Sequence, residues 1–245
     1  MIKLEHVVLP SPEQMGFVIE GMRNPMNSWD KSDSNCIDDC MECSDRKYCE
    51  HAMSSCGGKH FRGGNYIGPN DLSLMQKLSN AGTDHRKFMR MMPVMVRITA
   101  PLYWWKEFDT YKVGTVANSC STMHKITEKE FTLDDFSCEH LIYDTDDSMH
   151  EMYHYKNCLV HTINGLNSAR EHFLETKDKK YWWQLIQLLP SSYNQTRNVI
   201  FNYEVLANIY KSRRNHKLDE WREFCKWIES LPKSELITGL DILEK

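Results

Sequence analysis

The sequence predicts an α+β fold in which helices predominate over a small antiparallel or mixed sheet. Two stretches, residues 2–9 and 94–100, alternate apolar and polar residues or are rich in β-branched residues, as is typical of strands. Longer segments with apolar residues at helical spacing fill most of the second half of the chain. The sequence contains no internal repeat and no repeated strand–helix unit.

The first two elements are predicted from their boundary residues. Residues 2–9 suit an opening strand. Ser11 is a favourable helix N-cap, Pro12 suits the first helical position, and Gln14 completes a capping box. We therefore expect a helix from Pro12 to about Met22.

The next segments differ in composition. Residues 23–69 are rich in Asn, Ser, Asp, Gly and Cys and have little apolar periodicity, which predicts a long loop or insertion. A loop of that length in a compact domain is usually functional or tied by a metal. Asn70-Asp71 is expected to cap a helix through about Asn80, and Val94–Ala100 is expected to form a strand.

The second half is predicted to be mainly helical. An aromatic helix is expected over residues 102–111, with Tyr103, Trp104 and Trp105 in the core or at a subunit interface, or alternatively stacked on a ligand. Residues 113–124 read as a loop. Further helices are expected near 146–174, 179–189, 196–214 and 217–230. In the last of these, apolar residues at helical spacing predict a core face: Leu218, Trp221, Cys225, Ile228 and Leu231.

Composition and charge narrow the class of protein. The 245 residues are 41% hydrophobic and 26% charged, which is typical of one globular domain, expected to span residues 1–245. The net charge of −4 argues against bulk nucleic-acid binding, although two or three local cations suffice to hold a small anionic substrate. No apolar run approaches the ~18–20 residues of a membrane span, and the first residues lack a signal-peptide pattern. We therefore expect a cytoplasmic protein.

Five of the nine cysteines lie close together in a Cys-rich insertion at about residues 31–66. They are the candidate metal ligands Cys36, Cys40, Cys43, Cys49 and Cys56. An odd number of cysteines without an export signal disfavours a disulfide framework, whereas four thiolates suit tetrahedral zinc or an iron–sulfur cluster. The first three also match the cluster-binding triplet of radical S-adenosylmethionine enzymes, but the barrel repeat of those enzymes is missing. The alternative is an insertion with reduced, free thiols.

Two stretches carry candidate binding chemistry. Between residues 100 and 124, a strand and an aromatic helix are followed by a loop of small hydroxyl residues, which can present donors to a phosphate or a flavin. The alternative is a capped helix end whose hydroxyls bond locally. On a second helix, Asn202 and Arg213 lie along one stripe with Leu206 and Ile209, so an amide and a guanidinium share an apolar face. A bound polar group or a buried salt bridge explains such an arrangement.

The order of these segments resembles the flavin-dependent thymidylate synthases (ThyX family) over about residues 70–230. The residues that carry the resemblance are Gly82-Thr83-Asp84-His85, Phe88, Ala100-Pro101-Leu102-Tyr103, Leu188-Leu189-Pro190, Asn202, Arg213 and Glu220-Trp221. The resemblance implies a ThyX-like α+β fold and a homotetramer that binds FAD and deoxyuridine monophosphate (dUMP) between subunits. It further implies that flavin reduced by NADPH supplies hydride and that a folate supplies a one-carbon unit.

The resemblance also implies roles for individual residues. Arg213 corresponds to the arginine that polarises the uracil ring, and Asn202 to a flavin-contacting asparagine. Ser121, or Cys120 in an alignment without a gap, corresponds to the serine near the nucleotide, and a cysteine there could act as a nucleophile. Three further residues are candidates for binding the flavin or a phosphate: Lys112, Thr115 and Asn118.

Several family cations are missing from this chain. Thr110-Tyr111-Lys112 or its neighbours stand in place of an Arg-His-Arg triplet. Thr122 or Met123 stands in place of a further arginine. Glu204 stands in place of a helix arginine, which reverses the charge at that position. A lysine offers a point charge rather than a bidentate fork, so the phosphate site is expected to differ. Three lysines are available to compensate: Lys106, Lys112 and Lys125. The alternatives to thymidylate synthesis are a flavoprotein of the same fold that modifies another pyrimidine nucleotide and a non-enzymatic, metal-stabilised interaction protein.

Overall fold

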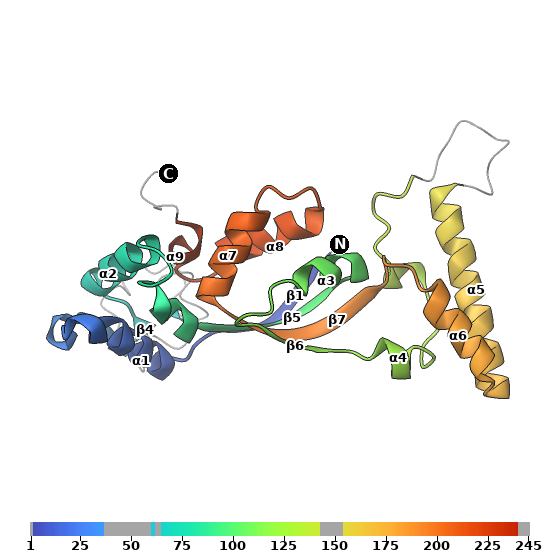
Figure 1. Cartoon of the computed structure of the whole chain (residues 1–245), viewed down its shortest axis with the longest axis horizontal. Helices are drawn as coiled ribbons and strands as arrows, with labels where there is room; N and C mark the ends of the chain where they lie inside the picture. Colours follow the sequence, from blue (N-terminus) through green and yellow to red (C-terminus); the bar gives the residue numbers. More distant parts are fainter. Residues whose placement is uncertain (1, 37–59, 62–64, 143–153, 240–245) are drawn as a thin grey trace, which may run out of the picture. The chain divides into compact units, whose positions relative to one another are not determined.

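The computed structural model describes residues 2–36, 60–61, 65–142 and 154–239, and it confirms a helix-rich α+β fold (Figure 1). The strands are β1 (Lys3–Val8), β2 (Asn35–Cys36), β3 (His60–Phe61), β4 (Asn65–Tyr66), β5 (Pro93–Pro101), β6 (Val116–Ser119) and β7 (Asn194–Asn202). The α-helices are α1 (Pro12–Arg23), α2 (Pro69–Asn80), α3 (Leu102–Phe108), α4 (Thr122–Lys125), α5 (Tyr155–Thr176), α6 (Lys179–Leu188), α7 (Tyr203–Arg213), α8 (Asp219–Glu229) and α9 (Glu235–Thr238). Short 3-10 helices are η1 (Asn24–Met26), η2 (Trp29–Lys31), η5 (Lys87–Met91) and η6 (Leu133–Asp135).

The main sheet has four strands in the order β1-β5-β7-β6. Thr99 lies opposite Thr196, with hydroxyls 2.7 Å apart, and Arg97 donates a 3.5 Å hydrogen bond to Asn198. The residue numbers of one strand fall as those of the other rise, so the central strands β5 and β7 run antiparallel. Thr–Thr pairs of this kind stabilise neighbouring strands.

The same register continues into the helices that follow β5 and β7. The N–H of Leu102, the first residue of α3, donates to the carbonyl of Tyr193 at 2.9 Å. The N–H of Tyr203, the first residue of α7, donates to the carbonyl of Met92 at 3.2 Å. The strand pairing therefore fixes where both helices begin.

The chain divides into two compact units, each assembled from segments that are distant in sequence. Unit 1 contains residues 1–3, 98–110 and 118–197, and unit 2 contains residues 4–97, 111–117 and 198–245. The expectation of one domain over residues 1–245 stays a prediction. No helix in the described part of the chain is long and apolar enough to cross a membrane.

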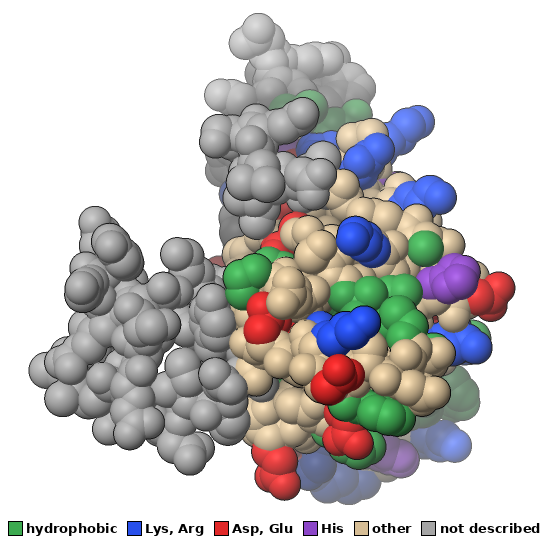
Figure 2. Space-filling view, turned by 90° about the vertical axis from the view of Figure 1, so that its left-hand side faces the viewer, with side chains coloured by type: hydrophobic (Ala, Val, Ile, Leu, Met, Phe, Trp, Pro, Cys, Tyr) green, Lys and Arg blue, Asp and Glu red, His purple; other side chains and the backbone are tan. Residues whose placement is uncertain are grey.

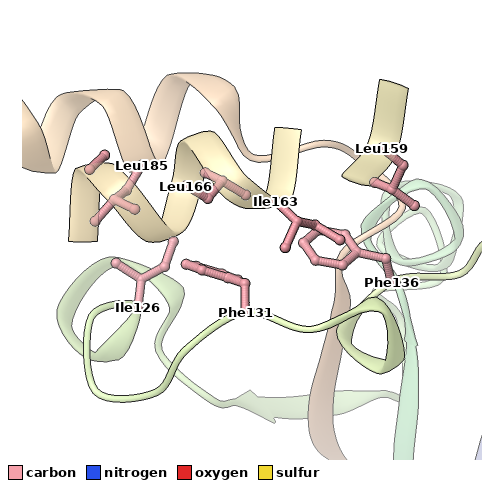
Figure 3. Close-up of a cluster of buried hydrophobic side chains, with 8 residues drawn as sticks. Ile126, Phe131, Phe136, Leu159, Ile163, Leu166 and Leu185 are labelled. Atoms are coloured by element: carbon pink, nitrogen blue, oxygen red, sulfur yellow. The ribbon is translucent and has the colours of Figure 1, made fainter. Parts of the chain in front are cut away.

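The core of unit 1 lies between α5, α6 and the segment that follows α4 (Figure 3). Leu159, Ile163 and Leu166 project from α5 toward Phe131 and Phe136. Leu185 of α6 and Leu166 are fully buried. The aromatic helix α3 adds Trp104 and Trp105, which are also fully buried and pack edge to face. The sequence prediction that these tryptophans belong to the core is thus confirmed.

The core of unit 2 includes the predicted apolar face of α8. Trp221 and Ile228 are fully buried, and Cys225 and Leu231 are nearly so. Burial raises the pKa of the Cys225 thiol to about 12. Helix α7 packs against α8, α9 and η5.

Three sequence predictions of secondary structure are wrong. The segment 196–214 begins as strand β7 and becomes helical only at Tyr203, since its β-branched and aromatic residues pair with β5. The expected loop 113–124 contains β6 and α4. The N-cap position of α2 is Gly68, and Asn70-Asp71 lie inside its first turn. The expected helix over 146–174 begins at Tyr155 among the described residues.

The ends of the Cys-rich insertion are held together by a small sheet in the order β2-β4-β3. Asn35 pairs with Tyr66, and Cys36 pairs with Asn65. Cys36 is therefore on β2 at the root of the insertion. The other candidate metal ligands lie outside the described residues: Cys40, Cys43, Cys49 and Cys56.

A buried carboxylate joins this root to α1 and α2. Asp71 Oδ1 accepts a 2.5 Å hydrogen bond from Arg23 Nε, and Oδ2 accepts from the hydroxyls of Ser32 and Ser34. Burial raises the pKa of Asp71, but hydrogen bonds from Ser34, Ser32 and Arg23 outweigh that effect and hold its pKa below the ordinary value.

Asp33 completes the connection by capping α2. Its carboxylate accepts the N–H groups of Asn70 and Asp71 at 2.9 and 3.1 Å. A Cβ on Gly68 would lie 2.2 Å from the Asp33 side chain, so this close approach requires glycine. Residues 32–34 are thus fixed to the first turn of α2.

We predict that Asp71→Asn destabilises the fold by about 3 kcal/mol, because Arg23 would be left as a buried charge without its carboxylate. The free energy of unfolding in urea at pH 7 measures this loss. Asp30→Asn, at an exposed position in the same region, is the control and should change it by less than about 0.5 kcal/mol. Equal, small effects of both substitutions would contradict the role given to Asp71.

Candidate functional site

The predicted site residues fall into two groups. Cys120, Ser121 and Asn118 belong to unit 1, whereas the remaining four belong to unit 2: Lys112, Thr115, Asn202 and Arg213. Each group is described within its own unit.

Unit 1 contains a polar cavity of about 270 Å³ that is lined by Cys120 and Ser121. The backbone of Cys120 is fixed on both sides: its N–H donates to the carbonyl of Thr196 at 2.9 Å, and its carbonyl accepts from Gln195 Nε2 at 3.0 Å. Cys120 is exposed and makes no disulfide. A thiol is thereby held at the edge of a cavity of nucleoside size.

Ser121 also has a structural role. Its hydroxyl accepts the N–H of His124 at 3.1 Å, so Ser121 is the N-cap of the short helix α4. The alternative interpretation of this segment, a capped helix end, is therefore observed. Asn118 lies on β6 and is exposed.

The other wall of the cavity carries charged residues that the sequence analysis missed. Lys129 forms a 2.5 Å ion pair with Asp135, and this contact raises the pKa of Lys129. Lys3 and Asp134 line the same cavity. No spacing in the sequence indicated them, because the segment after α4 brings Lys129 and Asp135 to the sheet only through tertiary packing.

Tyr193, just before β7, and Asn194, the first residue of β7, complete this wall. Burial raises the pKa of Tyr193, so its hydroxyl remains protonated and can donate. The Oδ1 atom of Asn194 is buried and has no hydrogen-bond partner among the described residues. The cavity therefore offers a thiol, hydroxyls, amides, cations and carboxylates, a donor and acceptor set that suits a polar ligand.

In unit 2, Arg213 lies in a corner formed by two aromatic rings. Its Nε donates a 2.8 Å hydrogen bond to the Tyr111 hydroxyl. Its guanidinium carbon lies 4.7 Å from the ring centre of Trp221 and 5.6 Å from that of Tyr111. The predicted stripe of Asn202 and Arg213 on one helix face does not form, since Asn202 precedes the helix.

Asn202 is the N-cap of α7, and its Oδ1 accepts the Val205 N–H at 3.0 Å. The loop 110–115 packs closely against this cap. Gly114 has a φ of +79°, and a Cβ there would lie 3.0 Å from Asn202 Nδ2 and 2.9 Å from Val205 Cγ2. Thr115 donates from its hydroxyl to the Tyr111 carbonyl. The fold thus brings Tyr111, Thr115, Asn202 and Arg213 into one region of unit 2, with Lys112 exposed beside them.

The charge reversal at Glu204 has a structural explanation. Glu204 is buried, and its carboxylate contacts Arg90 and, at 3.4 Å, Arg86. Arg86 also donates to Asn208 at 3.0 Å. Hydrogen bonding from Arg90 lowers the pKa of Glu204. Glu204 therefore makes a buried salt bridge of its own, while a salt bridge of Arg213, the alternative expected for this segment, stays a prediction.

Within the described residues, no group of three or more His, Cys, Asp and Glu side chains is arranged to hold a metal ion. The zinc or iron–sulfur hypothesis for the insertion stays a prediction.

No protein-family model matches the sequence. No curated protein matches it either. The structure, however, matches solved enzymes over nearly its whole length, and its fold is that of the flavin-dependent thymidylate synthases.

One similar structure is the flavin-dependent thymidylate synthase ThyX from Helicobacter pylori complexed with FAD and dUMP. The match covers 97% of this chain and 98% of that one, with a TM-score of 0.60 and 14% sequence identity. Another is the UMP/dUMP methylase PolB from Streptomyces cacaoi bound with 5-Br dUMP, with 98% and 95% coverage, a TM-score of 0.58 and 12% identity. The ThyX-like fold expected from the sequence is confirmed.

We predict that Glu204→Gln destabilises the protein by about 2 kcal/mol at pH 7, a value reduced from that of a fully buried pair because Arg90 is half-exposed. Because the pKa of Glu204 is lowered in the folded state, its contribution is complete above its ordinary value of 4.5 and is lost as the pH falls through the lowered pKa. The difference in unfolding free energy between wild type and variant should therefore shrink in acid.

Urea unfolding at several pH values measures that difference. Glu223→Gln, which removes an exposed pair with Lys226, is the matched control and should cost less than about 1 kcal/mol. A difference between wild type and Glu204→Gln that stays constant down to pH 3 would contradict this account.

Proposed function

We propose that this protein is a flavin-dependent enzyme that modifies the uracil ring of a pyrimidine nucleotide. The observation that carries the proposal is the shared fold: it extends over nearly the full length of both this chain and a ThyX enzyme complexed with FAD and dUMP. The most specific form of the proposal is reductive one-carbon transfer to dUMP, with FAD, NADPH and a folate donor. The flavin, once reduced by NADPH, would supply the hydride.

Arg213 is the residue that we propose to act on the pyrimidine ring. A guanidinium near a uracil carbonyl stabilises the negative charge that develops on the ring when a neighbouring carbon is attacked. Its contacts with Tyr111 and Trp221 support the proposal, because they hold the charge in one place before any ligand binds.

Cys120 and Ser121 are proposed to lie beside the nucleotide in the cavity of unit 1. Both residues are exposed, but the Ser121 hydroxyl already accepts a hydrogen bond as the cap of α4. This difference favours Cys120 as the functional partner of the pair. As a nucleophile, its thiolate would bond to C6 of the uracil ring while the C5=C6 electron pair moves toward the O4 carbonyl.

The side chains proposed to bind the flavin or a phosphate are those of Asn202, Lys112, Thr115 and Asn118. These side chains fit a flavin dinucleotide in chemical terms, since the Asn202 amide and the exposed Lys112 ammonium donate to ring carbonyls and to a diphosphate, respectively. Asn202 Oδ1 caps α7, so the Nδ2 group is the one assigned to the flavin.

Two further features belong to the proposal. The first is a homotetramer, which exposed hydrophobic side chains of unit 2 support: Phe17 is 65% exposed and lines an open depression with Val18, Met91 and Pro93. Figure 2, viewed from the side of α1 and α2, shows hydrophobic side chains gathered among charged ones. The second is a metal bound by the Cys-rich insertion.

A different pyrimidine nucleotide is the second candidate substrate. It is favoured by the missing family cations and by the similarity to an enzyme described as a UMP/dUMP methylase. Rescue of a thymidine-requiring strain separates the two: growth supports thymidylate synthesis, and failure together with methylation of UMP in vitro supports the second candidate.

We predict that Arg213→Ala lowers turnover by about 10²- to 10³-fold, as loss of one charge-stabilising donor does in other enzymes, while bound FAD is retained. Mass spectrometry of the nucleotide product after incubation with FAD, NADPH, a methylene-folate and dUMP measures turnover. Arg214→Ala, the exposed neighbour at the end of α7, is the control and should keep near-normal turnover. Unfolding of the Arg213 variant, or equal effects at both positions, would contradict the role.

We predict that Cys120→Ala lowers turnover more than 10-fold without unfolding the protein. Ser121→Ala should instead cost about 1 kcal/mol of stability through loss of the α4 cap and have a smaller effect on turnover. Turnover and urea unfolding of both variants separate the two residues. The reverse ranking would assign the position beside the nucleotide to Ser121.

A further inference from the structure

We propose that Tyr111 is a positioning residue: its hydroxyl fixes the orientation of the Arg213 guanidinium and thereby raises the affinity for a pyrimidine nucleotide. This inference rests on the proposed function, in which Arg213 contacts the nucleotide. Tyr111 itself acts through Arg213 and needs no contact with the ligand.

The hydrogen bond from Arg213 to Tyr111 has a geometry suited to this task. The donor is Nε, 2.8 Å from the phenol oxygen, so the bond sets the rotation of the guanidinium plane. The Nη1–Nη2 fork at the far end of the group takes no part in this bond. That fork is one of the two edges through which an arginine makes bidentate contacts with carbonyl or phosphate oxygens. Tyr111 therefore orients the group through Nε and does not occupy the Nη1–Nη2 edge.

The two rings restrain the guanidinium in its remaining directions. Trp221 is fully buried and packs edge to face against Phe224, so its ring cannot turn away from Arg213. Tyr111 meets Trp221 edge to face with ring centres 5.9 Å apart. The hydrogen bond to Tyr111 and the two neighbouring rings thus restrain a side chain with several rotatable bonds, and this part of the ordering cost is met before a ligand arrives.

Tyr111 is in turn held by α7, the helix that carries Arg213. The Thr115 hydroxyl bonds to the Tyr111 carbonyl, and Gly114 lies against Asn202 and Val205 at the start of α7. The loop that carries Tyr111 packs at the start of α7, and Arg213 extends from its last turn, so the same helix positions both groups.

The place of Tyr111 in the sequence bears on this positioning role. Tyr111 lies in the segment Thr110-Tyr111-Lys112 that stands where cations are expected from the sequence resemblance. Within that segment, the uncharged hydroxyl of Tyr111 orders the charge on Arg213.

The test is a double-mutant cycle on the FAD-loaded full-length protein, with dUMP dissociation constants measured by isothermal titration. Tyr111→Phe should weaken dUMP binding about 5- to 10-fold, while FAD affinity and the unfolding midpoint change little. In the Arg213→Ala background the same substitution should change dUMP affinity less than 2-fold. Tyr210→Phe, which removes another tyrosine hydroxyl bond in unit 2, to Glu229, is the matched control and should leave dUMP affinity unchanged.

Three outcomes would overturn the positioning role. These are additive effects of Tyr111→Phe and Arg213→Ala, unchanged dUMP affinity in Tyr111→Phe, and a parallel loss of FAD binding and stability that marks Tyr111 as merely structural. If the wild-type protein binds no dUMP, the proposed function fails. The positioning role then fails with it, because it is defined by dUMP affinity.

Discussion

The antiparallel pairing of β5 with β7 is the constraint on which the rest of this structure depends. One register, set by the Thr99–Thr196 pair, extends beyond the strands to the first residues of both following helices, Leu102 and Tyr203. Helix α3 supplies buried tryptophans to unit 1, and α7 carries Asn202 at its cap and Arg213 in its last turn. A slip of one residue would exchange the faces of the strand and displace both helices.

Two positions of unit 2 that differ from the family pattern contact arginines of the same unit. Glu204 stands where the family resemblance places a cation, yet its carboxylate is buried against Arg86 and Arg90, so cations remain beside α7. Tyr111, in the segment that stands in place of the family's Arg-His-Arg triplet, bonds to Arg213. At Glu204 and at Tyr111, a departure from the family pattern is thus accompanied by a contact with an arginine of the same unit.

The sequence predicted what local chemistry determines. The capping box of α1, the apolar face of α8 and the buried Trp104 and Trp105 could all be recognised from spacing. The prediction failed for 196–214, because whether its apolar residues form a strand or a helix depends on a partner strand nearly one hundred residues earlier. For the same reason the cavity wall with Lys129 and Asp135 could not be foreseen, and Tyr111 gave no signal of its bond to Arg213.

The most direct test of the central claim is a visible-light titration of the FAD-loaded protein with dUMP. If this fold holds a flavin and a pyrimidine nucleotide at one reactive centre, FAD should co-purify or bind stoichiometrically. Addition of dUMP should then shift the flavin absorbance bands in a saturable way. Protein that remains colourless after incubation with FAD, or flavin bands that no pyrimidine nucleotide alters, would contradict the account.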